Sequence, residues 1–372
     1  MISLICFGMI YLYLFFAVFI SYWQIDQAQY WDSAVHLFAA WFTRTYTFPD
    51  FTGWNPFFFA GYPHDTFYGP LFHYIVALLS FPLGLLVAQK TLYIITISIL
   101  PPSYYYFARK FGFNKNESSL MTLLMMFAAV TLNLACGGTL YSLFLVGLAP
   151  HALAMPLYFV FAGKLKEVCR DFLAQGTSPP GRVLLLLVTL SVLLLLTHFV
   201  VIFAAVITAG LIYCFHFSAK TFRFALKHLL LTALCSAFFW LPMVFYLTGV
   251  KDDATILSMG FFLTLPLVLL IVGGAGVVAL DKDNRFDPLL LMLIGIFSVM
   301  VFIDFGQLGL PMDAYRFIFF FLSFAMMLPA KLLLNNLNNE VAKRVLLFVF
   351  IALISIQLAI VILPNKRLDI NR

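Results

Sequence analysis

Apolar stretches of about 20 residues recur along this chain from residue 3 to residue 363, and each is long enough to cross a bilayer as a helix. Hydrophobic residues make up 63% of the sequence and charged residues only 10%, whereas a soluble protein carries about 25% charged residues. We therefore predict an all-α, polytopic transmembrane helical bundle that forms a single domain over residues 1–372. The candidate spans are 3–22, 91–108, 119–136, 143–162, 183–198, 200–217, 229–248, 258–280, 288–304, 314–333 and 345–363.

Basic residues predict which loops face the cytoplasm. Most of the 22 Lys and Arg residues fall into clusters between the candidate spans, and the positive-inside rule places such clusters on the cytoplasmic side. The net charge of +6 therefore indicates membrane topology and not nucleic-acid binding. The clustered residues are Arg109, Lys110 and Lys115; Lys164, Lys166, Arg170 and Arg182; Lys220, Arg223 and Lys227; Lys282 and Arg285; and Lys331, Lys343 and Arg344.

The segment 69–88 is also apolar, but the alternation of charge argues against a crossing there. If 3–22 crosses from inside to outside, residues 23–90 must begin and end on the external side. Pro70 and Gly84 fit a helix that lies on the outer membrane surface. We thus predict a multi-pass protein of the cell membrane with about eleven spans and a cytoplasmic N-terminus. Its first large loop is external and contains juxtamembrane helices.

Asp32 and His36 are the first candidates for a chemical site in that loop. They stand four residues apart in Trp31–Tyr46, whose apolar residues follow a helical pattern, and this spacing places two side chains on one helix face. A carboxylate there can take a proton from a hydroxyl, and an imidazole can orient it or bind phosphate. The alternatives are an interface helix whose polar side, including Arg44, is incidental, and a divalent-metal pair. No third metal ligand is identifiable, so we predict no cofactor.

The stretch that follows is rich in turns and aromatic rings. It contains Gly-Tyr-Pro-His-Asp at 61–65, where Gly and Pro interrupt regular structure. Rings on such turns can stack on sugars or can form an interfacial belt. We expect His64, Asp65 and Tyr68 to line a substrate site together with His36 and Arg44.

Arg316 begins a late apolar segment at its predicted external end. A charged side chain at this depth is costly unless it is paired. Its planar guanidinium suits the phosphate or pyrophosphate of a lipid carrier. The alternatives are a salt bridge to Asp304 or Asp313, or a side chain that extends back to the interface.

A pattern in the first loop resembles a known family. Asp-x-x-x-His-Leu, Trp-x-Pro, Gly-Tyr-Pro and Phe-Tyr-x-Pro-Leu-x-x-Tyr follow one another there, and a later Leu-Pro precedes Arg316-Phe317. The pattern is similar to that of bacterial and archaeal polytopic membrane proteins with a GT-C glycosyltransferase-like fold, the 6-pyruvoyl-tetrahydropterin-synthase-related and YfhO-like proteins. The matching first-loop residues are Asp32, His36, Leu37, Trp54, Pro56, Gly61, Tyr62, Pro63, Phe67, Tyr68, Pro70, Leu71 and Tyr74.

The resemblance implies an external active site, a lipid-phosphate-linked sugar as donor and a first-loop Asp as base. We therefore predict a membrane glycosyltransferase that moves a sugar from a polyprenyl-phosphate carrier to an external acceptor. Asp32 is the expected base, and Arg316 is expected to hold the carrier phosphate. The alternatives are a non-catalytic transporter of lipid-linked saccharides and a structural subunit of an envelope assembly complex. The next external loop, 136–142, has no acidic residue, which favours these alternatives.

Overall fold

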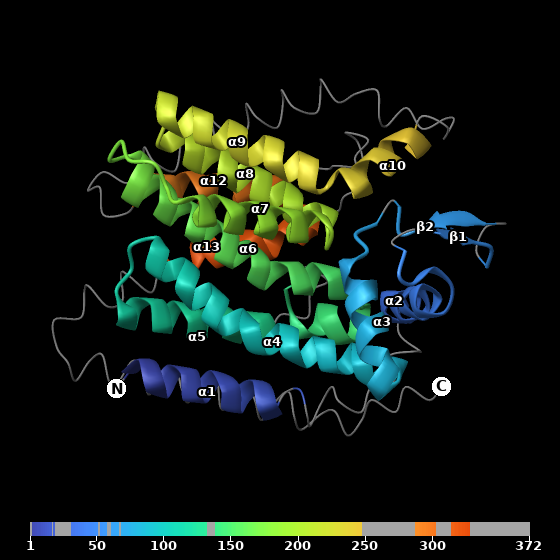
Figure 1. Ribbon diagram of the computed structural model, residues 1–372. Helices are drawn as coiled ribbons and strands as arrows, with labels where there is room; N and C mark the ends of the chain where they lie inside the picture. Colours follow the sequence, from blue (N-terminus) through green and yellow to red (C-terminus); the bar gives the residue numbers. More distant parts are fainter. Residues whose placement is uncertain are drawn as a thin grey trace.

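The structure is a computed structural model, and it describes residues 2–16, 18, 31–50, 53–57, 61–66, 68–131, 138–247, 287–302 and 314–327. Within these ranges the chain is mostly helical, as predicted, with a short β-hairpin (Figure 1). The hairpin pairs β1 (Gly53–Asn55) with β2 (Tyr62–His64) in antiparallel register. The helices are α1 (Ile2–Phe16), α2 (Trp31–Phe42), α3 (Leu71–Leu83), α4 (Leu85–Lys110), α5 (Lys115–Thr131), α6 (Ala149–Val168), α7 (Gly181–Leu195), α8 (Phe199–Phe215), α9 (Ala219–Cys235), α10 (Ala237–Leu247), α12 (Pro288–Phe302) and α13 (Ile318–Ala325).

Short helical turns of other kinds adjoin these helices. The π-helical turn Thr43–Thr47 extends α2, and another, Ser142–Val146, lies just before α6. A third, Cys169–Leu173, extends α6, and the 3₁₀ turn Ala314–Phe317 leads into α13.

The long helices lie side by side, with α6 in the middle of the bundle. Helix α6 packs along α4, α7 and α8, and α9 packs on the outer side of α7. The α4–α5, α6–α7 and α8–α9 connections lie at one end of the bundle, at the left of Figure 1. Helices α2 and α3 and the hairpin lie at the opposite end. The described basic clusters therefore gather at the end remote from the first loop.

Few of the predicted spans are matched by single long helices. Among the described residues, α4 alone is long and apolar enough to cross a membrane, and α9 with α10 gives a second only if the pair, bent by 73°, is one span. Several other helices are apolar but shorter, namely α1, α3, α7, α8 and α12. The predicted spans 258–280 and 345–363 lie outside the described residues. The structure therefore does not confirm eleven crossings.

Two helix boundaries differ from the predicted ones for local reasons. Gly84, with φ of +77°, ends α3, and α4 then runs unbroken through Lys90, so 69–88 and 91–108 are not separate segments. The side chain of Ser218 accepts a hydrogen bond from the backbone of Thr221 and caps α9 before the first basic residue. The predicted span 229–248 is divided between α9 and α10 by a bend of 73° at Ser236.

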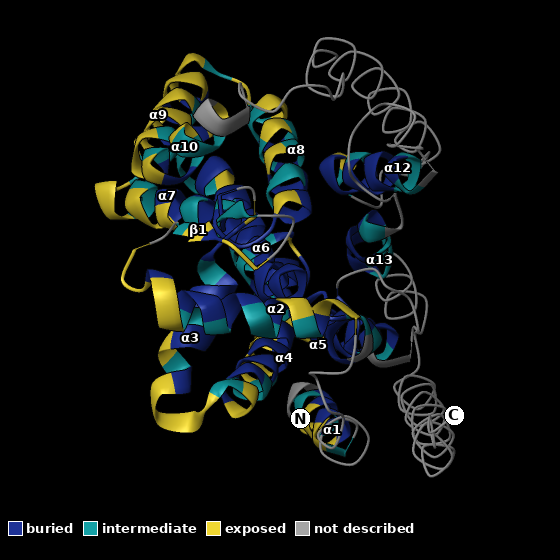
Figure 2. Ribbon diagram, turned by 90° about the vertical axis from the view of Figure 1, so that its right-hand side faces the viewer, coloured by how far each residue is buried: buried dark blue, intermediate teal, exposed yellow. Residues whose placement is uncertain are grey.

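Burial is concentrated in α6, whereas the outer helices expose apolar side chains. Figure 2 shows α6 in the buried colour and much of α9 and α10 in the exposed one. Leu229 and Leu234 on α9 are 66% and 71% exposed, and Leu185 on α7 is 66% exposed. Neighbouring leucines that are exposed to this extent are typical of a surface that contacts lipid or another protein. The outer face of α7 and α9 is therefore suited to contact with lipid.

Candidate functional site

Asp65 is the centre of a polar cluster at the first-loop end of the bundle. It directly follows β2 and has φ of +54°, a left-handed conformation that Asp tolerates better than most residues. The hairpin register pairs Gly53 with His64 and thereby fixes the position at which the chain turns into Asp65. The carboxylate then points into the protein, where Asp65 is only 5% exposed.

Two imidazoles hold the buried carboxylate. Nδ1 of His73 lies 2.8 Å from Oδ1, and Nε2 of His64 lies 3.3 Å from Oδ2. Burial alone would raise the pKa of Asp65, but His73 and His64 outweigh it and hold the pKa at about 2. The carboxylate is therefore ionised at neutral pH, and its Oδ1 accepts a hydrogen bond from His73.

His36 extends the cluster from His73 toward helix α2. Nδ1 of His36 lies 2.9 Å from Nε2 of His73, and His36 is 7% exposed. Burial and the neighbouring His73 lower the pKa of His36 well below its usual value, and Asp65 opposes them only in part. His36 is consequently neutral at neutral pH.

A second set of hydrogen bonds supports His64 on its other side. The Asn55 side-chain amide donates to the Tyr62 hydroxyl over 3.4 Å, and that hydroxyl lies 3.3 Å from Nδ1 of His64. Thr43 Oγ1 lies 3.2 Å from Nε2 of the same ring. These residues come from the hairpin and from the turn after α2, so the hydrogen bonds connect the hairpin to that helix.

Close backbone contacts bring distant helices to the cluster. The amide of Leu71 donates to the carbonyl of Leu196 over 2.9 Å, and a Cβ on Gly69 would lie 2.5 Å from that carbonyl oxygen. A Cβ on Gly147, which has φ of +89°, would lie 2.1 Å from the backbone nitrogen of Ser33. Glycine at these two positions lets the α7–α8 turn and the corner before α6 reach the first loop.

Tyr68 lies where these elements meet. Its ring lies 5.7 Å from that of His36, 6.1 Å from that of His73 and 5.9 Å from that of His198 in the α7–α8 connection. Its phenol oxygen is surrounded by enough protein that burial raises its pKa. Arg316 opposes this shift, while Asp32 and Asp65 add to it. The pKa of the Tyr68 hydroxyl thus depends on both negative and positive groups of the site.

Two further histidines continue the site on the side of Arg316. The rings of His151 and His198 are 4.6 Å apart, and the two residues are 0% and 3% exposed. Neither ring nitrogen of His151, and not Nδ1 of His198, has a hydrogen-bond partner among the described residues. Burial lowers the pKa of His198, and His151 and Arg316 lower it further. These polar atoms are available to a ligand that brings its own donors or acceptors.

The structure places the predicted site residues unequally. The cluster contains four of the predicted residues, namely His36, His64, Asp65 and Tyr68. Asp32 and Arg316 are related to it by their effect on the pKa of Tyr68. Asp32 is exposed in the first turn of α2, and the hydrogen bond of His36 found among the described residues is with His73 and not with Asp32. Arg44 lies 5.0 Å from the ring centre of Phe81, and no described contact joins it to the cluster.

Sequence reasoning missed several members of the site. His73 stands in the apolar segment 69–88, where a single imidazole among aliphatic residues was the only signal. His151 and His198 are each isolated in sequence, and Asn55 and Tyr62 read as ordinary turn residues. Within the described part of the chain, no three His, Cys, Asp or Glu side chains are arranged to hold a metal ion. The imidazoles instead bond to Asp65 and to each other.

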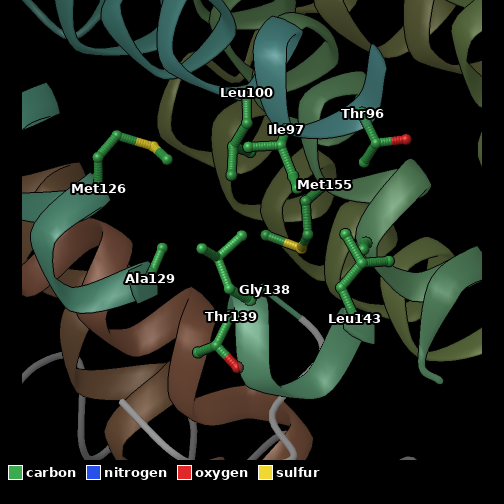
Figure 3. Close-up of a pocket in the computed structure, with 11 residues that line it drawn as sticks. Thr96, Ile97, Leu100, Met126, Ala129, Gly138, Thr139, Leu143 and Met155 are labelled. Carbon is green, nitrogen blue, oxygen red and sulfur yellow. The ribbon is translucent and has the colours of Figure 1, made fainter. Parts of the chain in front are cut away.

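A separate, mostly apolar pocket lies deeper in the bundle. Figure 3 shows Leu100 of α4, Met126 of α5 and Met155 of α6 around it, with the hydroxyls of Thr96 and Thr139. None of the cluster residues lines this pocket. It is therefore not the polar site.

No protein-family model matches the sequence, and no curated protein matches it. The functional interpretation consequently depends on the residues and their geometry, together with the first-loop pattern.

Proposed function

We propose that this protein is a multi-pass membrane glycosyltransferase that moves a sugar from a polyprenyl-phosphate carrier to an acceptor outside the cell. One observation carries the proposal: Tyr68 contacts the rings of His36 and His198, so the helix of the carboxylate Asp32 meets the part of the site where the guanidinium of Arg316 acts on His198. Transfer from a sugar phosphate requires such a pair, because a base and a group that binds phosphate must face one reacting centre.

The membrane location is supported by the surface of the bundle. Exposed leucines cover α7 and α9, and the described basic clusters lie at the end away from the first loop. In this topology the basic end is cytoplasmic, and α2, α3 and the hairpin form an external platform. Further spans are assigned to the shorter apolar helices and to the apolar segments outside the described residues.

This topology is tested by labelling single cysteines with a membrane-impermeant maleimide. In a variant without native cysteines, Asp50→Cys in the first loop should react on intact cells. Asn116→Cys at the basic end should react only after permeabilisation. Both positions are exposed, so burial does not explain a difference between them. Equal labelling of the two on intact cells would exclude the topology.

In the proposed reaction Asp32 takes the proton of the acceptor hydroxyl. The hydroxyl oxygen bonds to the anomeric carbon, the carbon–oxygen bond to the carrier phosphate breaks, and the phosphate leaves with the electron pair. Arg316 binds the phosphate, whose charge grows as the bond breaks. The nitrogens of His151 and His198 that have no partner among the described residues provide hydrogen bonds to the phosphate oxygens. Arg316 also acts on His198, whose pKa it lowers.

Asp32→Asn removes the basic oxygen and keeps the size of the side chain. With a panel of radiolabelled polyprenyl-phosphate hexoses and membranes that contain the protein, transfer should fall by roughly 10²–10⁴-fold, the usual contribution of a general base. Asp50→Asn, which removes another exposed carboxylate of the same loop, is the matched control and should retain transfer. Full transfer by the Asp32 variant would show that this residue is not the base.

A further inference from the structure

Three buried side chains of the cluster form one continuous line of hydrogen bonds. Oδ1 of Asp65 lies 2.8 Å from Nδ1 of His73, and Nε2 of His73 lies 2.9 Å from Nδ1 of His36. All three residues are at most 7% exposed. Nε2 of His36 has no hydrogen-bond partner among the described residues, so the line has an open end there.

The protonation states determine the direction of this line. An ionised carboxylate only accepts hydrogen bonds, so Nδ1 of His73 must carry a hydrogen. When His73 is neutral, its Nε2 is a lone pair, and Nδ1 of His36 donates to it. A neutral His36 then carries its single hydrogen on Nδ1. Its Nε2 is left as a lone pair that is free to take a proton.

Uptake of one proton at this open end changes both rings. When Nε2 of His36 gains a proton, the hydrogen on its Nδ1 can pass along the 2.9 Å hydrogen bond to Nε2 of His73. His36 is neutral again, as the other tautomer, and His73 becomes an imidazolium beside the carboxylate of Asp65. Burial disfavours a charge on His36, whereas the contact with Asp65 stabilises one on His73. The line therefore carries the charge away from its open end.

We propose that Asp65, His73 and His36 form a proton-accepting chain, open at Nε2 of His36, that takes over from Asp32 the proton released by the acceptor hydroxyl. The direction of the chain follows from its hydrogen bonds to an ionised Asp65 and from a neutral His73, whereas its use in transfer rests on the function proposed above. His36 is the proton acceptor, and His73 and Asp65 position it and stabilise the charge.

Asp32 and His36 are suited to this exchange because they lie one turn apart on α2. Side chains at this spacing share a helix face. The carboxylate of Asp32 is exposed, so an acceptor bound over it would separate it from water. The adjoining imidazole then offers a proton acceptor within the protein.

The step balances without any further reactant. The proton leaves the acceptor hydroxyl for Asp32 as the new glycosidic bond forms and the bond to phosphate breaks. It then passes to Nε2 of His36, and the hydrogen on Nδ1 of His36 passes to His73. Asp32 becomes a carboxylate again, and the chain holds one added proton until water removes it.

Other charged and titratable groups surround the open end, and each enters the pH dependence of the chain. Tyr68 lies against the rings of both His36 and His73. His198 interacts with His36 electrostatically. His151 and Arg316 act in turn on His198, and both oppose the placement of positive charge near it.

His64 supplies a matched control within the same cluster. It also contacts Asp65, but its Nδ1 faces the Tyr62 hydroxyl, and no hydrogen bond among the described residues joins it to His73 or His36. His64→Gln should therefore leave the chain from Asp65 to His36 in working order, whereas His73→Gln interrupts it.

The chain can be observed directly by ¹⁵N NMR of the imidazole rings in the detergent-solubilised protein. The chain has seven histidines, so single His→Gln variants are sufficient to assign the signals. At alkaline pH both His36 and His73 should carry hydrogen on Nδ1 alone. On acidification, His36 should switch to the Nε2–H tautomer at the same pH at which His73 becomes doubly protonated.

The wild-type titration decides the matter even if a variant fails to fold. A His36 that is itself doubly protonated, or that carries hydrogen on Nε2 at every pH, overturns the chain. So do two rings that titrate independently of each other. The coupled switch supports it, and should persist in His64→Gln and disappear in His73→Gln.

The pH profile of transfer tests the use of the chain. In the wild type, kcat should fall on acidification with the midpoint of the tautomer switch, and His73→Gln should lower kcat about 10²-fold at neutral pH while KM changes little. If kcat falls at the same acidic pH in His73→Gln as in the wild type, the chain is not used in transfer. This result would leave the proposed transferase function intact. A coupled switch in a protein that transfers no sugar from any donor would overturn the proposed function, and with it this role.

Discussion

His198 should make the folded state sensitive to acid, and its replacement should remove a defined part of that sensitivity. The ring is 3% exposed in the α7–α8 connection, and burial, His151, Arg316 and His36 all lower its pKa below 6.5. In the unfolded chain the same ring titrates at about 6.5. Between these two pKa values the unfolded state binds more protons, so the free energy of unfolding falls as the pH is lowered.

The magnitude follows from the linkage relation. A histidine that stays neutral in the folded state costs about 1.4 kcal/mol per pH unit once the pH is below its unfolded pKa. Integrated from pH 7.5 to pH 5.5, this amounts to about 1.4 kcal/mol for the one ring. The contribution of His198 is complete above about pH 6.5 and is lost below it.

The measurement is unfolding by sodium dodecyl sulfate in mixed micelles, followed by tryptophan fluorescence at pH 7.5 and 5.5. His198→Gln should lose about 1.4 kcal/mol less than the wild type between the two pH values, whatever its stability at pH 7.5. Asn116→Gln, at an exposed position that does not titrate, should behave as the wild type. Parallel pH dependence of the wild type and His198→Gln would refute the argument that His198 is held neutral.

Two further substitutions test the packing that holds the site. Gly69→Ala would put a Cβ 2.5 Å from the carbonyl oxygen of Leu196, so the free energy of unfolding should fall by about 1–3 kcal/mol, measured by the same unfolding assay. Tyr104→Phe removes a buried hydroxyl that donates to the carbonyl of Ser323 over 2.5 Å, so the free energy of unfolding should fall by about 1–3 kcal/mol. The neighbouring variant Tyr105→Phe is the control. It should lower the free energy of unfolding by less, because no hydrogen bond of the Tyr105 hydroxyl is found among the described residues.

Local sequence patterns predicted where the helices of the first loop lie in the sequence, but they predicted the tertiary contacts of these helices less well. The helix expected in Trp31–Tyr46 is confirmed as α2 and its π-helical extension. The segment 69–88 is predicted as a helix on the outer membrane surface, and it contains α3, which packs against α2. Its boundary was wrong because the conformation of Gly84, and not hydropathy, separates α3 from α4. A hydropathy pattern contains no information about a single left-handed residue.

The partner of His36 could not be predicted from spacing. Its position four residues after Asp32 correctly placed both on one helix, but a buried imidazole is stabilised by whichever polar group the tertiary fold presents to it. That group is His73, 37 residues away on α3. The contact exists only because the hairpin and the turn at Asp65 fold α3 back against α2. Cluster membership of His198 likewise depends on the contact between Gly69 and Leu196.

The cluster has a feature that stability alone does not explain. A buried carboxylate with two imidazoles is weak support for stability, because desolvation of the charge offsets much of the attraction between the groups. An apolar set of side chains of the same size would fill the space between α2 and α3 equally well. The chain instead keeps Asp65 in a left-handed conformation, with a hydrogen bond from His73 on α3 and the ring of His64 in the hairpin 3.3 Å from its other oxygen. A rigid carboxylate sets the tautomers that these rings have before a proton arrives, and a defined starting tautomer is what a site that moves protons requires. The same reasoning separates Asp65 from Asp32: the buried acid cannot touch a substrate, and the exposed one can.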